Sequence, residues 1–275
     1  MNRDQVEALV AGIQLPKSNV YYEASSADGF AFLGAARARL GLDCSSELEA
    51  IEDRDFCLNA AQTINKTQTR LPADTQYVYT LWACCELVRE IAHSRHLGRV
   101  MSTLESIGSY PDGMARYCTH EIRYKVPNVT SAAASLFAFA GNIDRAEALV
   151  ALLRARQRGG NWSYSVQGPG GWKASGVEDS HHLAMMIYQL RQVQMACGVP
   201  TADIVGLALA ELKRINSPRI AANVVGWSIP MVHAATMGLD NDLAARSLRA
   251  TLRTSIRHPN FRVRALSAWA LTRWL

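Results

Sequence analysis

The feature that most constrains the fold is a repeating pair of helices with different hydrophobic patterns. The more apolar helices each start at Asp or Asn, at intervals of 37 to 54 residues: Asp28, Asp74, Asn128, Asp179, Asn223 and Asn260. Intervening segments such as 144–156 and 241–255 carry a single apolar stripe and many charges. A helix that is apolar on most sides is buried, whereas a single stripe is typical of a helix covered on one side. This period is typical of helix-pair repeats and predicts an inner and an outer ring of helices.

The number of predicted helices indicates a closed ring. Six inner helices and five intervening ones need one more outer helix, which the amphipathic segment 4–13 can supply. We therefore predict an all-α fold, an (α/α)6-type toroid of alternating inner and outer helices, as a single domain over residues 1–275. We expect segment 4–13 to pack near the apolar helix that begins at Asn260. We also expect more than half of the residues in helices and almost no strand.

The composition excludes several classes of protein. No run approaches 18 apolar residues, so we expect no transmembrane helix, and the first residues lack the apolar stretch of a signal peptide. Six cysteines are scattered without a CxxC motif, which indicates reduced thiols and a cytoplasmic protein. The net charge of +5 favours anionic ligands, but no Lys/Arg cluster suggests a nucleic-acid partner.

Segment 159–190 combines a glycine-rich loop with a helix start and is the strongest candidate site. The loop at 159–176 carries three aromatic residues, and the helix start carries titratable groups: Trp162, Tyr164 and Trp172, then Asp179, His181 and His182. The aromatic side chains are either a ligand platform or a packed cover, and Asp179 is either an N-cap or a catalytic acid. Adjacent helical residues face about 100° apart, so we expect one histidine to face a cavity and the other to contact the loop.

A second group of candidates precedes the helix at Asn128. Arg123 and Lys125 can reach the mouth of the ring and bind an anion there, or they can lie in an ordinary solvated loop. Cys118 and His120 suggest a metal site together with His181, but zinc sites have three or four ligands of clearer spacing. We therefore expect no metal and no cofactor.

Four segments of the chain resemble the α/α-toroid superfamily: PNVTSAAASLFAFAG, RGGNWSYS, GGW and VEDSHHLAMMIYQL. The terpenoid-cyclase and prenyltransferase branch has Asp/Asn-Xaa-Thr helix starts after Gly-Gly-Trp loops. The carbohydrate-active branch has Trp-Xaa-Tyr loops before Asp-Xaa-Xaa-His helix starts. The resemblance is close over 128–190 and otherwise architectural. Neither the DxDD motif of terpenoid cyclases nor the zinc ligands of prenyltransferases can be matched.

This resemblance implies an enzyme that acts on a carbohydrate, expected to be an acidic poly- or oligosaccharide, by lyase or epimerase chemistry or by hydrolysis. His181 or His182 would be the base and Tyr164 would return the proton. Trp162 and Trp172 would stack on sugar rings, and Asn128, Arg123 or Lys125 would neutralise the sugar carboxylate. In hydrolysis, Asp179 and Asp74 would form the acid/base pair. The alternatives are a terpenoid-cyclase-like enzyme with an apolar cavity, and a non-catalytic toroid that binds a ligand or protein. The sequence also allows a homodimer.

Overall fold

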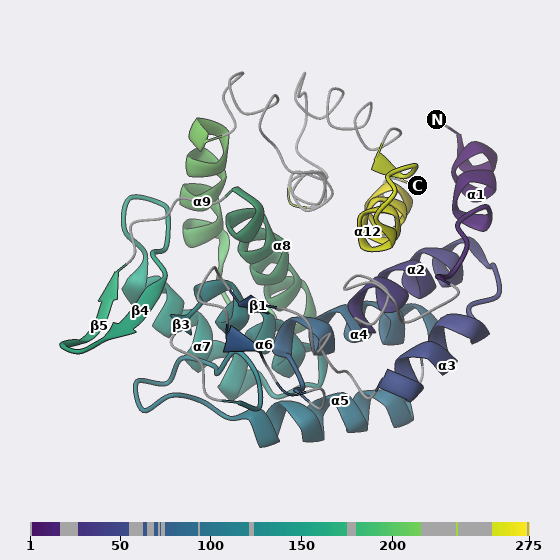
Figure 1. Cartoon of the computed structure of the whole chain (residues 1–275). Coiled ribbons are helices and arrows are strands. Elements are labelled where there is room, and N and C mark those ends of the chain that lie inside the picture. The colour runs from purple at the N-terminus through teal and green to yellow at the C-terminus, as the bar shows by residue number, and fades with distance from the viewer. Residues whose placement is uncertain are drawn as a thin grey trace. The chain divides into compact units, whose positions relative to one another are not determined.

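The structure is a computed structural model that describes residues 2–16, 27–54, 63–64, 69–70, 72, 75–92, 94–120, 124–174, 180–215, 235, 255–273 and 275. Over these residues the chain is mainly helical (Figure 1). The helices are α1 (Arg3–Ala11), α2 (Ala27–Leu40), α3 (Ser45–Arg54), α4 (Val78–Ile91), α5 (Ser94–Ile107), α6 (Pro127–Phe139), α7 (Ile143–Arg156), α8 (Ser180–Cys197), α9 (Ala202–Ile215) and α12 (Phe261–Thr272). The strands are β1 (Thr63–Ile64), β2 (Thr69–Arg70), β3 (Tyr124–Lys125), β4 (Ser165–Gly168) and β5 (Gly171–Ala174).

The contacts within the chain define two compact units. Unit 1 comprises residues 1–100 and 236–275, and unit 2 comprises residues 101–235. The single-domain organisation stays a prediction. Within the described ranges, no helix has the length and apolar character needed to cross a membrane.

Unit 1 is organised around α2, which packs against α1, α3, α4 and α12. Its centre is aromatic: the ring of Phe32 lies 5.7 Å from that of Trp82 and 5.1 Å from that of Trp269, measured between centroids. All three side chains are fully buried. Tilted and edge-on aromatic contacts of this kind add to the stabilisation from burial alone.

Buried acidic residues in unit 1 are neutralised by arginines from neighbouring elements, as a buried charge requires. The pairs are Asp28 with Arg262, Glu47 with Arg37, and Glu86 with Arg273. They connect α2 to α12, α2 to α3, and α4 to the residue that follows α12. These pairs specify which helices are neighbours.

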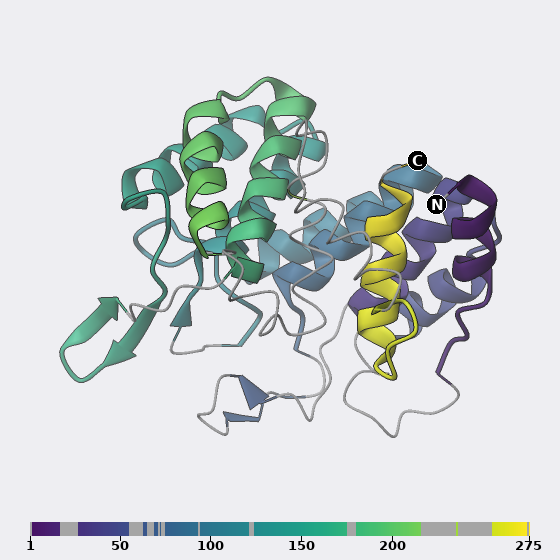
Figure 2. The same ribbon diagram turned by 90° about the horizontal axis from the view of Figure 1, so that it is seen from above.

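The two ends of the described chain meet in unit 1. Helix α1 packs against α2 and α12, which confirms the expected pairing of the N- and C-terminal helices (Figure 2). Val6, Val10 and Ile13 supply the buried stripe, while Leu9 is only half-buried. The interface therefore depends more on Val10 than on Leu9.

Unit 2 places α6 in contact with both α7 and α8, and α8 in contact with α9. Helix α6 is buried at every position from Pro127 to Ala138, whereas α7 buries only Ala146, Val150 and Leu153. The alternation between helices that are buried on most sides and helices that are buried on one side is therefore confirmed. Ser131 and Ser135 on α6 hydrogen-bond to Gln189 and Gln192 on α8, which fixes the register between these two helices.

The glycine-rich segment differs from the loop that we predicted over 159–176. Its second half forms an antiparallel hairpin, β4–β5, and β3 pairs with the other edge of β4, giving the strand order β3-β4-β5. The hairpin extends away from the helices of unit 2 (Figure 2). The strands are only two to four residues long, too short for an alternating pattern to stand out in the sequence.

The predicted helix starts at Asp28, Asn128 and Asn260 lie at the N-termini of helices, but not always as caps. The start predicted at Asp74 is wrong, because α4 begins at Val78 with Tyr77 as its N-cap. Asn260 caps α12, because its Oδ1 accepts a hydrogen bond from the Val263 N–H at 3.2 Å. Asn128 is instead the second residue of α6, since Pro127 occupies the first turn and Val126 is the N-cap. Asp28 likewise lies inside the first turn of α2, paired with Arg262. Asp74, Asp179 and Asn223 lie outside the described residues.

Candidate functional site

The segment that carries the candidate site is tied to α9 by a glycine turn. Arg158 and Asn161 exchange two backbone hydrogen bonds around Gly159 and Gly160. Gly160 has a φ of +90°, and a Cβ atom there would lie 2.6 Å from the carbonyl oxygen of Leu207 on α9. Only glycine combines this backbone conformation with so close an approach.

Trp162 follows this turn and anchors the segment to α7. Its side chain is 4% exposed, and its indole N–H donates a 2.8 Å hydrogen bond to the carbonyl of Leu153. That carbonyl belongs to the last turn of α7, where the helix itself leaves acceptors unused. Trp162 is therefore a fixed wall of the site.

The three-stranded sheet brings Lys125 beside the hairpin. Lys125 on β3 is opposite Ser165 on β4, and Gln167 on β4 is opposite Trp172 on β5. As a result the ammonium group of Lys125 lies 4.3 Å from the ring centroid of Trp172 and 5.1 Å from that of Tyr110. Distances of this kind are typical of cation–π contacts.

Asp112 is the acidic partner shared by Lys125 and Arg156; together with Tyr110 and Trp172 these residues form the Asp112 cluster. Its Oδ2 atom accepts hydrogen bonds from Lys125 Nζ at 2.7 Å and from Arg156 Nη2 at 3.0 Å. Partial burial acts to raise the pKa of Asp112, but the hydrogen bond from Lys125, a backbone N–H and the two positive charges outweigh it, so the pKa is lowered. The carboxyl group is therefore ionised near neutral pH, and two cations share one negative charge.

A cleft of about 110 Å³ opens beside this cluster. Its wall combines charged, hydroxyl and aromatic side chains: Asp112, Met114, Lys125, Pro127, Arg156, Trp162, Ser163, Ser165 and Trp172. A water molecule needs roughly 10–15 Å³ of such open space. The cleft therefore holds several waters or one small polar group of sugar-ring size.

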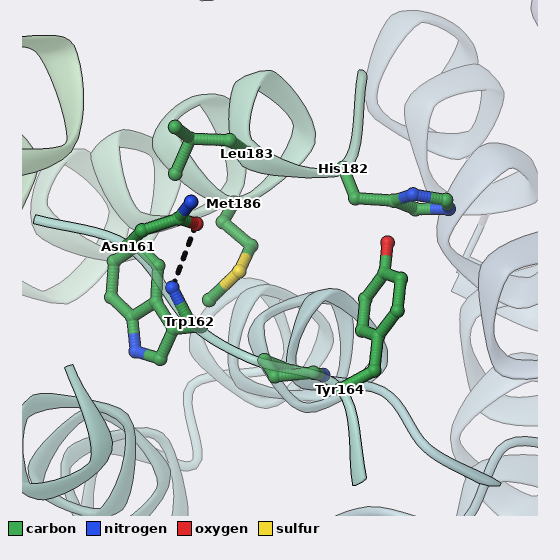
Figure 3. A pocket seen from close by; sticks show the side chains of 7 residues that line it. Asn161, Trp162, Tyr164, His182, Leu183 and Met186 are labelled. Carbon is green, nitrogen blue, oxygen red and sulfur yellow. Dashed lines mark hydrogen bonds between the residues drawn. The ribbon is translucent and has the colours of Figure 1, made fainter. Parts of the chain in front are cut away.

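A second, smaller space lies at the start of α8. It has room for about 10 Å³, close to a single water, and is lined by residues that include Trp162, Tyr164, His182 and Met186. In Figure 3 the hydroxyl end of Tyr164 points toward the imidazole of His182, and their ring centroids are 5.4 Å apart. Pro127 and Trp162 line both spaces, so the small pocket and the cleft share a wall.

The two histidines occupy different environments, as adjacent helical residues must. His181 is 4% exposed within α8, whereas His182 is half-buried and contacts Tyr164 of the loop. Their ring centroids are 5.1 Å apart. His182 is therefore the histidine that lines the small pocket.

The structure separates some candidates that the sequence grouped together. Trp162, Trp172 and Lys125 line the cleft, and Tyr164 and His182 line the adjoining pocket. Asn128 is buried in α6, with its amide nitrogen 3.9 Å from the Met185 sulfur, and does not line either space. Arg123, Asp74 and Asp179 lie outside the described residues.

Three members of the cluster were not predicted: Tyr110, Asp112 and Arg156. Asp112 belongs to a Pro-Asp-Gly turn, and Arg156 ends a charged helix, so each looks like an ordinary surface residue in the sequence. Asp112 and Arg156 lie 44 residues apart in the chain, so nothing local in the sequence indicates their contact.

Cys118 and His120, the suggested metal-site residues, are linked through the backbone of His120. The Cys118 thiol donates to the backbone carbonyl of His120 at 3.3 Å, and burial raises the thiol pKa to about 11. Among the described residues, no three His, Cys, Asp or Glu side chains are grouped so that they could hold a metal ion.

No known sequence family matches this chain, and no curated protein matches it. Solved structures do match. They include a family 76 glycoside hydrolase from a bovine Bacteroides thetaiotaomicron strain, with a TM-score of 0.65 and 9% identity over 98% of this chain and 76% of that one. The α-1,6-mannanase GH76A of a Salegentibacter species has a TM-score of 0.65 and 13% identity over 99% of this chain and 97% of that one. A family 76 mannosidase from Bacteroides thetaiotaomicron has a TM-score of 0.60 and 11% identity, over 99% and 95%.

These similarities establish the fold class. The chain has the all-α fold of the α/α toroids, built from alternating inner and outer helices, as the sequence predicted. At 9–13% identity they show the fold alone. The structures named above are carbohydrate-acting, and they lend no support to the terpenoid-cyclase alternative.

Proposed function

We propose that this protein is an enzyme that acts on a carbohydrate, with one sugar unit of the glycan bound in the cleft beside Trp172. The observation that carries the proposal is the composition of that cleft. It combines an aromatic wall, two serine hydroxyls and a partly neutralised pair of cations in a space of about 110 Å³. Aromatic surfaces with a few convergent polar groups are typical of small-molecule sites. The fold shared with glycoside hydrolases supports the same class of ligand.

The charge of the cleft favours an acidic glycan. Lys125 and Arg156 carry two positive charges, and Asp112 supplies one negative charge between them. A formal surplus of one positive charge remains on the wall, which attracts a carboxylate. In this proposal Arg156 takes over the role that the sequence suggested for Asn128, which is buried elsewhere.

The neighbouring pocket suits proton abstraction. His182 and Tyr164 contact each other and both line a space of about one water molecule, and that space shares the Trp162 wall with the cleft. Imidazole is the commonest general base in enzymes, and a phenol can return a proton. A sugar carboxylate held near Arg156 would make the adjacent C–H acidic, and His182 would remove the proton in a lyase or epimerase reaction.

Hydrolysis is the second candidate, favoured by the structural neighbours. The Salegentibacter mannanase is inactive when two successive aspartates are changed to asparagine, and that variant was solved with α-1,6-mannotriose. This chain contains no two successive aspartates, and its acidic pair before α8 is Glu178-Asp179. Glycoside hydrolysis needs one protonated and one ionised carboxyl group. Asp112 is held ionised by its cations, so Asp179, with Glu178 or Asp74, would have to supply the acid.

One assay separates these reactions. Purified protein is incubated with polyuronates and with neutral mannans, and the products are followed by ultraviolet absorbance of unsaturated sugars, by reducing ends and by NMR. Proton abstraction predicts unsaturated or epimerised products that are lost in His182→Gln. Hydrolysis predicts new saturated reducing ends that are lost in Asp179→Asn. Glycan binding without any product would support the non-catalytic alternative. If no glycan bound and no product formed, the proposal would be overturned.

A further inference from the structure

We infer that Arg156 is the residue that selects a carboxylate-bearing sugar in the cleft, and that Lys125 is an internal clamp that does not contact the ligand. This inference rests on the proposed function, because it assigns the charge recognition of the same cleft. Both side chains donate hydrogen bonds to Asp112, but the inference assigns recognition of the ligand carboxylate to Arg156 alone.

Lys125 is enclosed by its own chain. Its side chain is 9% exposed, and its ammonium group is held between the Asp112 carboxylate, the Trp172 ring and the Tyr110 ring. The rings of Tyr110 and Trp172 also contact each other edge-on, at 5.5 Å between centroids. Lys125 lines the cleft, but its ammonium group is already engaged by these three groups. Lys125 therefore holds the hairpin β4–β5 against the connection that carries Tyr110 and Asp112.

Arg156 is placed differently. Its side chain is 36% exposed, it is the last residue of α7, and it lines the cleft. One terminal nitrogen, Nη2, donates to Asp112 at 3.0 Å, and a guanidinium group has five N–H donors in a fixed fork. The contact with Asp112 orients the guanidinium group and uses one of these donors. The fork geometry matches a carboxylate better than an ammonium group does.

The test compares glycans that differ only in charge. Oligogalacturonates and oligomannuronates are each paired with the same oligosaccharide after chemical reduction of its carboxyl groups. Dissociation constants are measured by calorimetry for the wild type, Arg156→Met and Lys125→Met. Lys173→Met on the exposed part of β5 is the control for loss of a nearby positive charge. Folding of each variant is checked by circular dichroism.

The wild type should bind at least one charged oligosaccharide about tenfold or more tightly than its reduced form, as a hydrogen bond to a charged group implies. Arg156→Met should abolish this preference, so that the charged and reduced forms bind with nearly equal dissociation constants. Lys125→Met should weaken binding of both members of the pair and lower their ratio far less than Arg156→Met does, and Lys173→Met should change neither.

Several results would overturn the inference. A preference that survives in Arg156→Met, or one that disappears in Lys125→Met alone, would assign the recognition to another residue. Equal binding of charged and reduced oligosaccharides by the wild type would refute carboxylate selection while leaving a carbohydrate function in place. Binding of neither form would contradict the proposed function as well.

Discussion

The indole nitrogen of Trp162 donates a 2.8 Å hydrogen bond to the backbone carbonyl of Leu153, and this contact joins the candidate site to the end of α7. The side chain is almost completely buried at the wall shared by the cleft and the His182 pocket. We predict that Trp162→Phe leaves the Leu153 carbonyl without its donor and lowers the free energy of unfolding by about 1–3 kcal/mol. Urea denaturation measures this, with Trp172→Phe, at a half-buried position on β5, as the matched control. An unchanged midpoint in Trp162→Phe would refute the anchoring role.

Gly160 provides a backbone test of the same segment. An alanine there would adopt a φ near +90° with its Cβ 2.6 Å from the Leu207 carbonyl oxygen, so the turn would have to move away from α9. We expect Gly160→Ala to cost about 1–3 kcal/mol of stability, the usual range for a strained backbone position. Gly168→Ala, where a Cβ meets nothing within 4 Å, should cost less than about 1 kcal/mol. Equal thermal midpoints for the two variants would contradict this account of the turn.

The sequence predicted much of the fold because burial leaves a local signature. The continuous apolar run of α6 and the sparse stripe of α7 follow directly from whether each helix is covered on most sides or on one. Cap positions were less secure, because Pro127 begins α6 one residue before Asn128 and moves the asparagine inside the helix.

The site was predicted only in part, for a physical reason. The aromatic residues and histidines of 162–182 are close in the sequence and could be recognised together. Asp112 and Arg156 meet only because α7 ends beside the connection that contains Asp112, and two-residue strand pairing then adds Lys125. No local pattern encodes contacts of this kind, and a charged residue in a turn looks solvated until its partners are known.

The contact of α1 with α12 makes a prediction about the chain ends. Val10 is the fully buried residue of α1, so Val10→Asp should lower the free energy of unfolding by about 2–4 kcal/mol, from lost burial and a poorly solvated carboxylate. Leu9→Asp should cost less, because Leu9 is half-buried, and Ala8→Asp on the exposed face should cost less than about 1 kcal/mol.

Deletion of residues 1–14 should destabilise at least as much as Val10→Asp. It should also expose an apolar strip on unit 1 that promotes self-association, which size-exclusion chromatography with light scattering detects. A monomer of unchanged stability after the deletion would contradict the packing of α1 against α12.

The Asp112 cluster predicts a pH dependence at the acidic end. The pKa of Asp112 is lower in the folded protein than its ordinary value of 3.8, so the unfolded chain binds more protons in that range. The stabilisation is present above about pH 4 and is lost as the pH falls through the lowered value. Urea midpoints measured between neutral pH and about pH 3 should fall less steeply in Asp112→Asn than in the wild type. Identical profiles would show that the carboxylate contributes nothing to the folded state.

The most direct test of the central claim is a crystal structure of His182→Gln soaked with the oligouronate that the wild type binds best. The substitution removes the proposed base while keeping a polar side chain of similar reach. We predict one sugar ring in the cleft beside Trp172, with its carboxylate within hydrogen-bond distance of the Arg156 guanidinium and the Lys125–Asp112 pair intact. A glycan bound elsewhere on the protein, with this cleft holding only water, would contradict the assignment of the site.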